Sequence, residues 1–188
     1  MKRIISLVFA LGLLACPAMA TPTLTLDPAN GVIRGQPGAL IGWGFSITNT
    51  ADFLVPTSFQ FLPASALGAF TDFTGAPFFN FFVVGPGVYA DGTTVTQAFN
   101  STLGTGVGSF RIANTAVRGQ STLGNIELTY DLFSVSPNDP SFDPGADLVA
   151  TDQILIAPAS VDVPEPASLL LLGSGLALLV GFCLRRRG

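Results

Sequence analysis

The segment from residue 41 to residue 48 alternates strictly between large apolar and small side chains, and this pattern constrains the fold more than any other. The large side chains are Ile41, Trp43, Phe45 and Ile47, and a Gly, Ser or Thr follows each of them. Side chains two positions apart share one face of a β-strand. The pattern therefore predicts a half-buried strand whose apolar face carries Trp43 into the core.

Apolar segments recur through the rest of residues 21–163, and Gly, Pro, Asn and Asp separate them. Further strands are predicted at residues 23–26, 32–33, 57–62, 78–84, 93–99, 108–112, 125–135, 153–156 and 160–163. Asn30 and Gly31 have the sequence of a hairpin turn. Residues 64–69 would form one helical turn at most. Such spacing predicts an all-β fold class, an antiparallel β-sandwich of the jelly-roll or Ig-like kind.

Phenylalanine is concentrated in residues 78–84. Phe78, Phe79, Phe81 and Phe82 would occupy both faces of a strand at this place. We expect a strand in the centre of the core, and the alternative is a strand that exposes one aromatic face to a partner.

The N-terminus has the three parts of a secretory signal peptide. Lys2 and Arg3 precede the apolar residues 4–14, and Ala18-Met19-Ala20 forms the cleavage site. Cleavage is predicted after Ala20. In an alternative interpretation, Leu13-Leu14-Ala15-Cys16 resembles a lipoprotein signal in which Cys16 would be acylated, although Leu14 and Pro17 are unusual there.

The C-terminal residues predict a transmembrane helix. Residues 167–184 carry no charge and would span about 27 Å at about 1.5 Å per residue, enough to cross the hydrocarbon core of a bilayer. Arg185, Arg186 and Arg187 follow directly and are expected to stay in the cytoplasm. The precursor would then be a single-pass inner-membrane protein with a cytoplasmic C-terminus and an exported remainder. Small residues at 173, 177 and 181 could let a second helix approach.

Val163-Pro164-Glu165-Pro166 stands directly before the span. Both prolines favour extended geometry in the preceding residue, so we expect an exposed strip that a protease cleft can hold. Together with the Leu-rich span and the terminal arginines, this four-residue segment resembles the PEP-CTERM sorting signal of Gram-negative bacteria that make extracellular polysaccharide. The resemblance implies that an exosortase, a membrane transpeptidase-like protease, acts near Pro164, Glu165 and Pro166. The alternative is an ordinary anchor whose Pro-Glu-Pro is a linker.

These features divide the chain into a signal peptide (1–20), an exported domain (21–162) and a sorting tail (163–188) with its helix at 167–184. Segments 42–45 and 128–140 also resemble exported domains found ahead of this tail, which implies a β-rich domain and no particular activity. Release or transfer to the cell surface or extracellular matrix would follow processing.

The residue types present exclude several functions. The chain has no His. Its two Cys, Cys16 and Cys183, lie in the processing segments, so disulfides, Ser-His-Asp triads and common zinc sites are excluded from the exported domain. The basic residues of the exported domain are Arg34, Arg111 and Arg118, and Asp residues outnumber them. The domain is therefore acidic, and nucleic acid and anionic membrane surfaces are poor partners for it.

Paired carboxylates suitable for glycoside hydrolysis are also not expected. Glu127 and Asp131 would share one strand face about 13 Å apart, which is too far for either hydrolytic mechanism. We predict that Glu127 and Asp131 lie on a solvated face, opposite Ile126, Leu128, Tyr130 and Leu132, and that the domain is not an enzyme.

One acidic cluster deserves comparison with a calcium site. Asp139, Asp143 and Asp147 lie in a Pro-rich segment that could fold so that their oxygens converge on Ca²⁺. The spacing is not that of an EF-hand, and Asp before Pro commonly begins a turn. Either turns alone or a structural calcium site explains the cluster.

The predicted function is that of an exported surface or matrix protein, structural or adhesive in role, with an exosortase and exopolysaccharide as partners and no cofactor. A glycan- or calcium-binding module of the envelope is the alternative.

Overall fold

The computed structural model describes residues 21–165. The predicted signal cleavage site at Ala18 and Ala20, the transmembrane helix at 167–184, Pro166 and the arginines at 185–187 lie outside the described residues. Among residues 21–165, no helix is long and apolar enough to cross a membrane.

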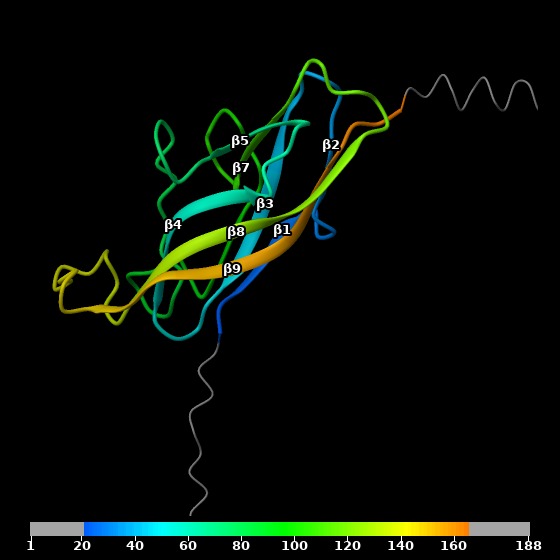
Figure 1. Cartoon of the computed structure of the whole chain (residues 1–188). Helices are drawn as coiled ribbons and strands as arrows, with labels where there is room; N and C mark the ends of the chain where they lie inside the picture. Colours follow the sequence, from blue (N-terminus) through cyan, green and yellow to red (C-terminus); the bar gives the residue numbers. More distant parts are fainter. Residues whose placement is uncertain (1–20, 166–188) are drawn as a thin grey trace, which may run out of the picture.

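The described chain is all-β, and its strands form two sheets (Figure 1). The strands are β1 (Thr23–Asp27), β2 (Val32–Arg34), β3 (Leu40–Thr48), β4 (Phe53–Leu62), β5 (Gly68–Asp72), β6 (Thr94–Gln97), β7 (Gly108–Ile112), β8 (Ser121–Phe133) and β9 (Leu148–Asp162). The first sheet has the order β1-β3-β7-β5, with β6 on the end of β3, and the second has the order β2-β9-β8-β4. Neighbours are antiparallel except β2 and β9, which are parallel.

Strand β3 contributes the centre of the core, as its alternation predicts. Trp43, Phe45 and Ile47 are fully buried. The Trp43 ring stacks on Phe61 of β4 with 5.6 Å between ring centroids, and Phe45 lies 5.8 Å from Phe59. Because β3 and β4 belong to different sheets, these aromatic contacts join the two layers through one core.

The two longest strands, β8 and β9, pair along the second sheet. Ile126, Leu128 and Tyr130 of β8 are buried, whereas the residues between them are not, so the predicted alternation of this strand is confirmed. The strands predicted at 153–156 and 160–163 are confirmed as parts of β9, but the break predicted between them is wrong, because β9 is continuous from Leu148 to Asp162. Strand β2 adds to β9 only at its last residues, from Ser160 to Asp162.

The predicted hairpin at Asn30 and Gly31 is also wrong. Strand β1 before the turn pairs with β3, whereas β2 after it pairs with β9. The turn therefore passes the chain from one sheet to the other. Gly31 adopts φ 67°, and an added Cβ would lie 2.1 Å from the Pro158 carbonyl oxygen, so this position requires glycine.

The strand predicted at 78–84 is wrong as well, because this segment is irregular. Phe82, Val83 and Val84 are buried in the core, but Phe79 and Phe81 are 68% and 59% exposed. Phe79 has φ 50°, a left-handed conformation that interrupts extended chain. The sequence pattern does not predict β5, whose first residues fall where at most one helical turn is expected.

Candidate functional site

The end of β9 is joined to the segment that the sequence singles out for processing. Asp162 is the last residue of β9 and pairs with Ser121 of β8 and Arg34 of β2. The Val163 N–H donates to the Gln120 carbonyl at 2.8 Å, and the Gly119 N–H donates to the Val163 carbonyl at 2.7 Å. Val163 is 1% exposed and belongs to the core. The folded domain thus extends to Val163.

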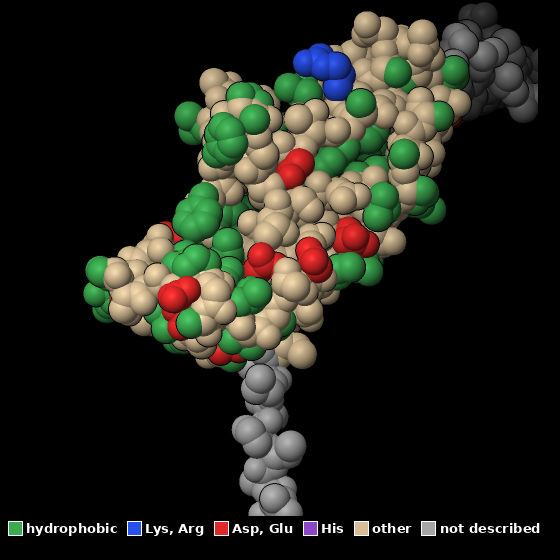
Figure 2. All heavy atoms as spheres, turned by 60° about the vertical axis from the view of Figure 1, so that its left-hand side comes forward, with side chains coloured by type: hydrophobic (Ala, Val, Ile, Leu, Met, Phe, Trp, Pro, Cys, Tyr) green, Lys and Arg blue, Asp and Glu red, His purple; other side chains and the backbone are tan. Residues whose placement is uncertain are grey.

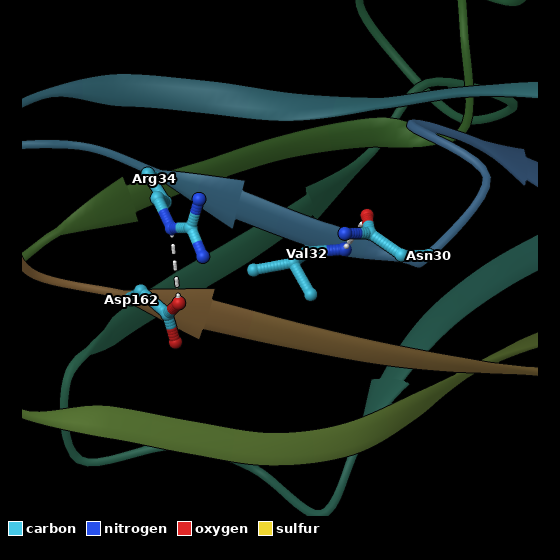
Figure 3. A network of polar contacts seen from close by, with 4 residues as sticks. All are labelled: Asn30, Val32, Arg34 and Asp162. Atoms are coloured by element: carbon cyan, nitrogen blue, oxygen red, sulfur yellow. Dashed lines mark hydrogen bonds and ion pairs between the residues drawn. The ribbon is translucent and has the colours of Figure 1, made fainter.

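Strand β2 holds the other side of this end of β9. The Arg34 Nε donates to an Asp162 carboxylate oxygen at 3.2 Å (Figure 3). The Gly35 N–H donates to the Asp162 carbonyl at 3.1 Å. At the other end of β2, the Val32 N–H donates to the Asn30 side-chain oxygen at 3.1 Å. The Arg34 side chain is largely exposed, so the ion pair contributes about 0–1 kcal/mol.

The chain leaves the sheet at Pro164. Pro164 is half-buried and Glu165 is exposed. The Glu165 side chain lies over Gly119, where an added Cβ would be 3.1 Å from Glu165 Oε1. Together these residues line a shallow hollow of about 320 Å³, with walls that include Arg34, Gly119, Gln120, Asp162, Pro164 and Glu165. We call residues 162–165 and the facing residues 119–121 the sorting junction.

The acidic loop between β8 and β9 (residues 134–147) lies at the opposite end of these strands from the sorting junction (Figure 1). Asp139 Oδ1 accepts from the Ser141 N–H at 2.8 Å and from its hydroxyl at 2.7 Å, and these bonds lower the pKa of Asp139. Asp143 Oδ1 accepts from the Gly145 N–H at 2.9 Å. Asp147 Oδ2 accepts from the Asp143 N–H at 2.8 Å. The three carboxylates therefore stabilise successive turns.

The structure does not bring these carboxylates together as a metal centre. Within residues 21–165, no group of three or more His, Cys, Asp or Glu is arranged to hold a metal ion. The calcium site stays a prediction.

Glu127 and Asp131 lie on the outer face of β8, between buried neighbours. Asp131 Oδ1 accepts from the Thr151 hydroxyl at 2.9 Å and from the Asp152 N–H at 3.0 Å. Asp152 has φ 52°, at the place where the β8 and β9 register shifts. Asp131 therefore stabilises an irregularity of β9.

Charge is unevenly distributed over the described surface. On the face in Figure 2, acidic side chains lie over the middle and lower parts, and basic side-chain atoms are visible only near the upper end. Arg34 contacts Asp162 of the sorting junction, and Arg118 directly precedes Gly119. The end of the domain that carries the junction is thus less acidic than the end with the loop 134–147.

The fold and the junction define an all-β domain joined without a spacer to a C-terminal processing segment. The chain carries a PEP-CTERM protein-sorting motif at residues 162–187. This match confirms the resemblance predicted from the sequence and supports an exported protein that an exosortase sorts. The motif begins at Asp162, so its first residues are part of the folded sheet.

Comparisons with whole proteins add little. The sequence matches no curated protein. A chain from the crystal structure of the CaDoc0917-CaCohA2 complex is 16% identical, with 76% of this chain and 99% of that chain covered and a TM-score of 0.24. A TM-score this low carries no argument about fold or function.

Sequence reasoning found the motif residues Val163, Pro164 and Glu165 but missed the residues that face them. Gly119 and Gln120 lie more than forty positions away in the chain, and neither has a sequence feature that predicts contact with Val163. Their role follows only from the pairing of β8 with β9.

Proposed function

We propose that the protein is an exported surface or matrix protein whose β-domain is delivered by exosortase processing of its C-terminal tail and then serves a structural or adhesive role. The observation that carries this proposal is the PEP-CTERM motif at residues 162–187. Its Pro-Glu-Pro segment follows directly on the last core residue, Val163. The partners that fit are an exosortase before processing and exopolysaccharide after it.

The short connection supports a position of the domain close to the membrane before processing. The apolar run begins at Ala167, about 14 Å at most from Val163 at about 3.5 Å per residue. If residues 167–184 span the inner membrane, the domain lies against the outer surface of that membrane until the tail is cut. The sorting junction would face the bilayer, and the acidic loop 134–147 would face away from it.

A structural or adhesive role draws support from the outer face of the second sheet. Leu123 of β8 and Ile154 and Ile156 of β9 are exposed there. Such apolar side chains suit contact with other matrix components. We expect no catalytic activity of the domain itself, because Glu127 and Asp131 occupy a strand face rather than a cleft. The two sheets are proposed to form a sandwich of the jelly-roll or Ig-like kind.

The test is the mass of the protein in the native host. Replacement of Pro164, Glu165 and Pro166 by Ala should leave the tail attached and the protein in the membrane fraction. Pro140→Ala with Pro144→Ala, in the exposed loop 134–147, is the matched control and should be processed like the wild type. Normal processing of the motif variant would refute the sorting proposal. A processed protein absent from the surface and matrix would refute the proposed role.

A further inference from the structure

The backbone of Val163 is fully used by the folded domain. Its N–H donates to Gln120 at 2.8 Å and its carbonyl accepts from Gly119 at 2.7 Å. Its side chain is 1% exposed. The two preceding residues, Val161 and Asp162, pair with β8 on one side and with β2 on the other. No edge of the chain is open at these positions.

The backbone of the next residue, Pro164, is not held by the domain in this way. Pro164 has no backbone N–H, and its carbonyl accepts no hydrogen bond from the part of the chain that the structure describes. Glu165 is exposed. At the C-terminal end of residues 21–165, the first backbone groups without a partner in that range therefore belong to Pro164 and Glu165.

A protease cleft holds its substrate as extended chain, through backbone hydrogen bonds like those of an added strand. Val163 can offer these bonds only after it leaves the sheet. That opening breaks its two hydrogen bonds and exposes a buried apolar side chain, so the open form is rare.

We propose that the folded domain determines where the tail is cut, because it withholds Val163 and all preceding residues and leaves the chain from Pro164 onward to the exosortase. The bond that breaks is then on the C-terminal side of Pro164. This inference rests on the proposed function. In the reaction the peptide C–N bond breaks, and the carbonyl carbon bonds to water or to a hydroxyl or amine acceptor. The proton lost by that nucleophile passes to the leaving amine nitrogen.

The position of the cut can be measured on the full-length precursor in a host with active exosortase. Mass spectrometry of the C-terminal peptide should find a product that ends at Pro164, Glu165 or a later residue. A product that ends at Val163 or earlier would overturn the inference while leaving exosortase processing intact. An uncut precursor would overturn the proposed function and this inference with it.

A second measurement tests whether the domain, and not the motif alone, sets the position of the cut. A flexible linker of about six Gly and Ser residues between Val163 and Pro164 places accessible chain before the motif without altering the core. Mass spectrometry should then find products that end within the linker, whereas a control with the same linker between Gly145 and Ala146 should still give products that end at Pro164 or later. Products of the linker variant that end only at Pro164 or later would overturn the inference, because the motif would then set the position of the cut by itself.

Discussion

Replacement of Trp43 by Phe tests how the two sheets are held together near the sorting junction. Trp43 is fully buried, and its indole N–H donates to the Gly31 carbonyl at 2.8 Å. Gly31 directly precedes β2 of the second sheet, so this bond joins the layers. Phe keeps most of the apolar contact with Phe61 but cannot donate.

The expected loss of stability is about 2 kcal/mol. The lost hydrogen bond accounts for about 1 kcal/mol, because the Gly31 carbonyl still accepts from the Ser160 N–H at 2.9 Å and is not left unpaired. The smaller ring leaves roughly 40 Å³ unfilled, which costs ~1 kcal/mol at about 24 cal/mol per Å³. Trp43→Ala should cost about 4 kcal/mol.

Urea unfolding followed by far-UV circular dichroism measures these losses on residues 21–165, a range that includes every residue of the described core. Circular dichroism replaces Trp fluorescence because the chain has a single Trp, which both Trp43 variants lack. Leu123→Ala, at a site 78% exposed, is the control and should change stability by less than about 0.5 kcal/mol. A Trp43→Phe variant as stable as the control, or as unstable as Trp43→Ala, would refute the reasoning.

Three further predictions concern single side chains. Burial raises the pKa of Tyr130 above its usual value of 10.0. The folded state therefore holds this proton more tightly, so stability is lost as the pH rises above about 10, and Tyr130→Phe should reduce that loss in urea titrations. An unchanged pH dependence would contradict this. Arg34→Ala should cost less than about 1 kcal/mol and lose its effect in high salt, whereas a larger cost would mean that the Asp162 pair is more than a surface contact. Gly119→Val should destabilise by about 1–3 kcal/mol in thermal melts, because Gly119 has φ 83°, and an unchanged melting temperature would argue against strain there.

Local patterns predict the strands whose side chains alternate. The alternation from Ile41 to Thr48 is confirmed by β3, and the predicted strand at 108–112 has the same bounds as β7. In both cases the signal lies in neighbouring residues. The inward set of Ile126, Leu128 and Tyr130 in β8 is predicted for the same reason.

Local patterns do not predict structure that depends on partners distant in the sequence. Residues 157–159 are Ala, Pro and Ala, which suggest a break between strands, yet they pair with residues 124–126 of β8 inside a continuous β9. Conversely, the Phe-rich segment 78–84 suggests a strand, but buried side chains can also come from an irregular loop. Val83 is an example. Its side chain is fully buried, although its N–H donates to the Asp91 carboxylate at 2.8 Å rather than to a strand.

The sorting junction is likewise predictable from the sequence only in part. Pro164 and Glu165 are recognisable because the motif is local, whereas the burial of Val163 depends on residues 119–120 of a distant loop. A sequence can therefore indicate which residues are processed, but only the pairing of β8 with β9 shows how many of them remain inside the fold.

The acidic loop 134–147 offers the clearest choice between two interpretations of one sequence feature. Ca²⁺ takes about six to eight oxygens at about 2.3–2.6 Å. In the structure, Asp139, Asp143 and Asp147 each accept local hydrogen bonds that shape the loop. A calcium site would have to exchange these bonds for metal contacts. We therefore expect the same melting temperature, within about 1 °C, in calcium and in EDTA.

If calcium does bind, the stabilisation it adds can be calculated. A site with a Kd of about 0.1 mM would add about 2.3 kcal/mol at about 5 mM calcium, which raises the melting temperature of a domain of this length by several degrees. Substitution of all three residues by Asn provides the control, because Asn still accepts the hydrogen bonds of the turns but removes the negative charge that a calcium site needs. If calcium raised the melting temperature of the wild type and not of this variant, the turns would be incidental and the domain would belong with calcium-dependent binding modules. If neither responds, the three carboxylates serve the loop alone.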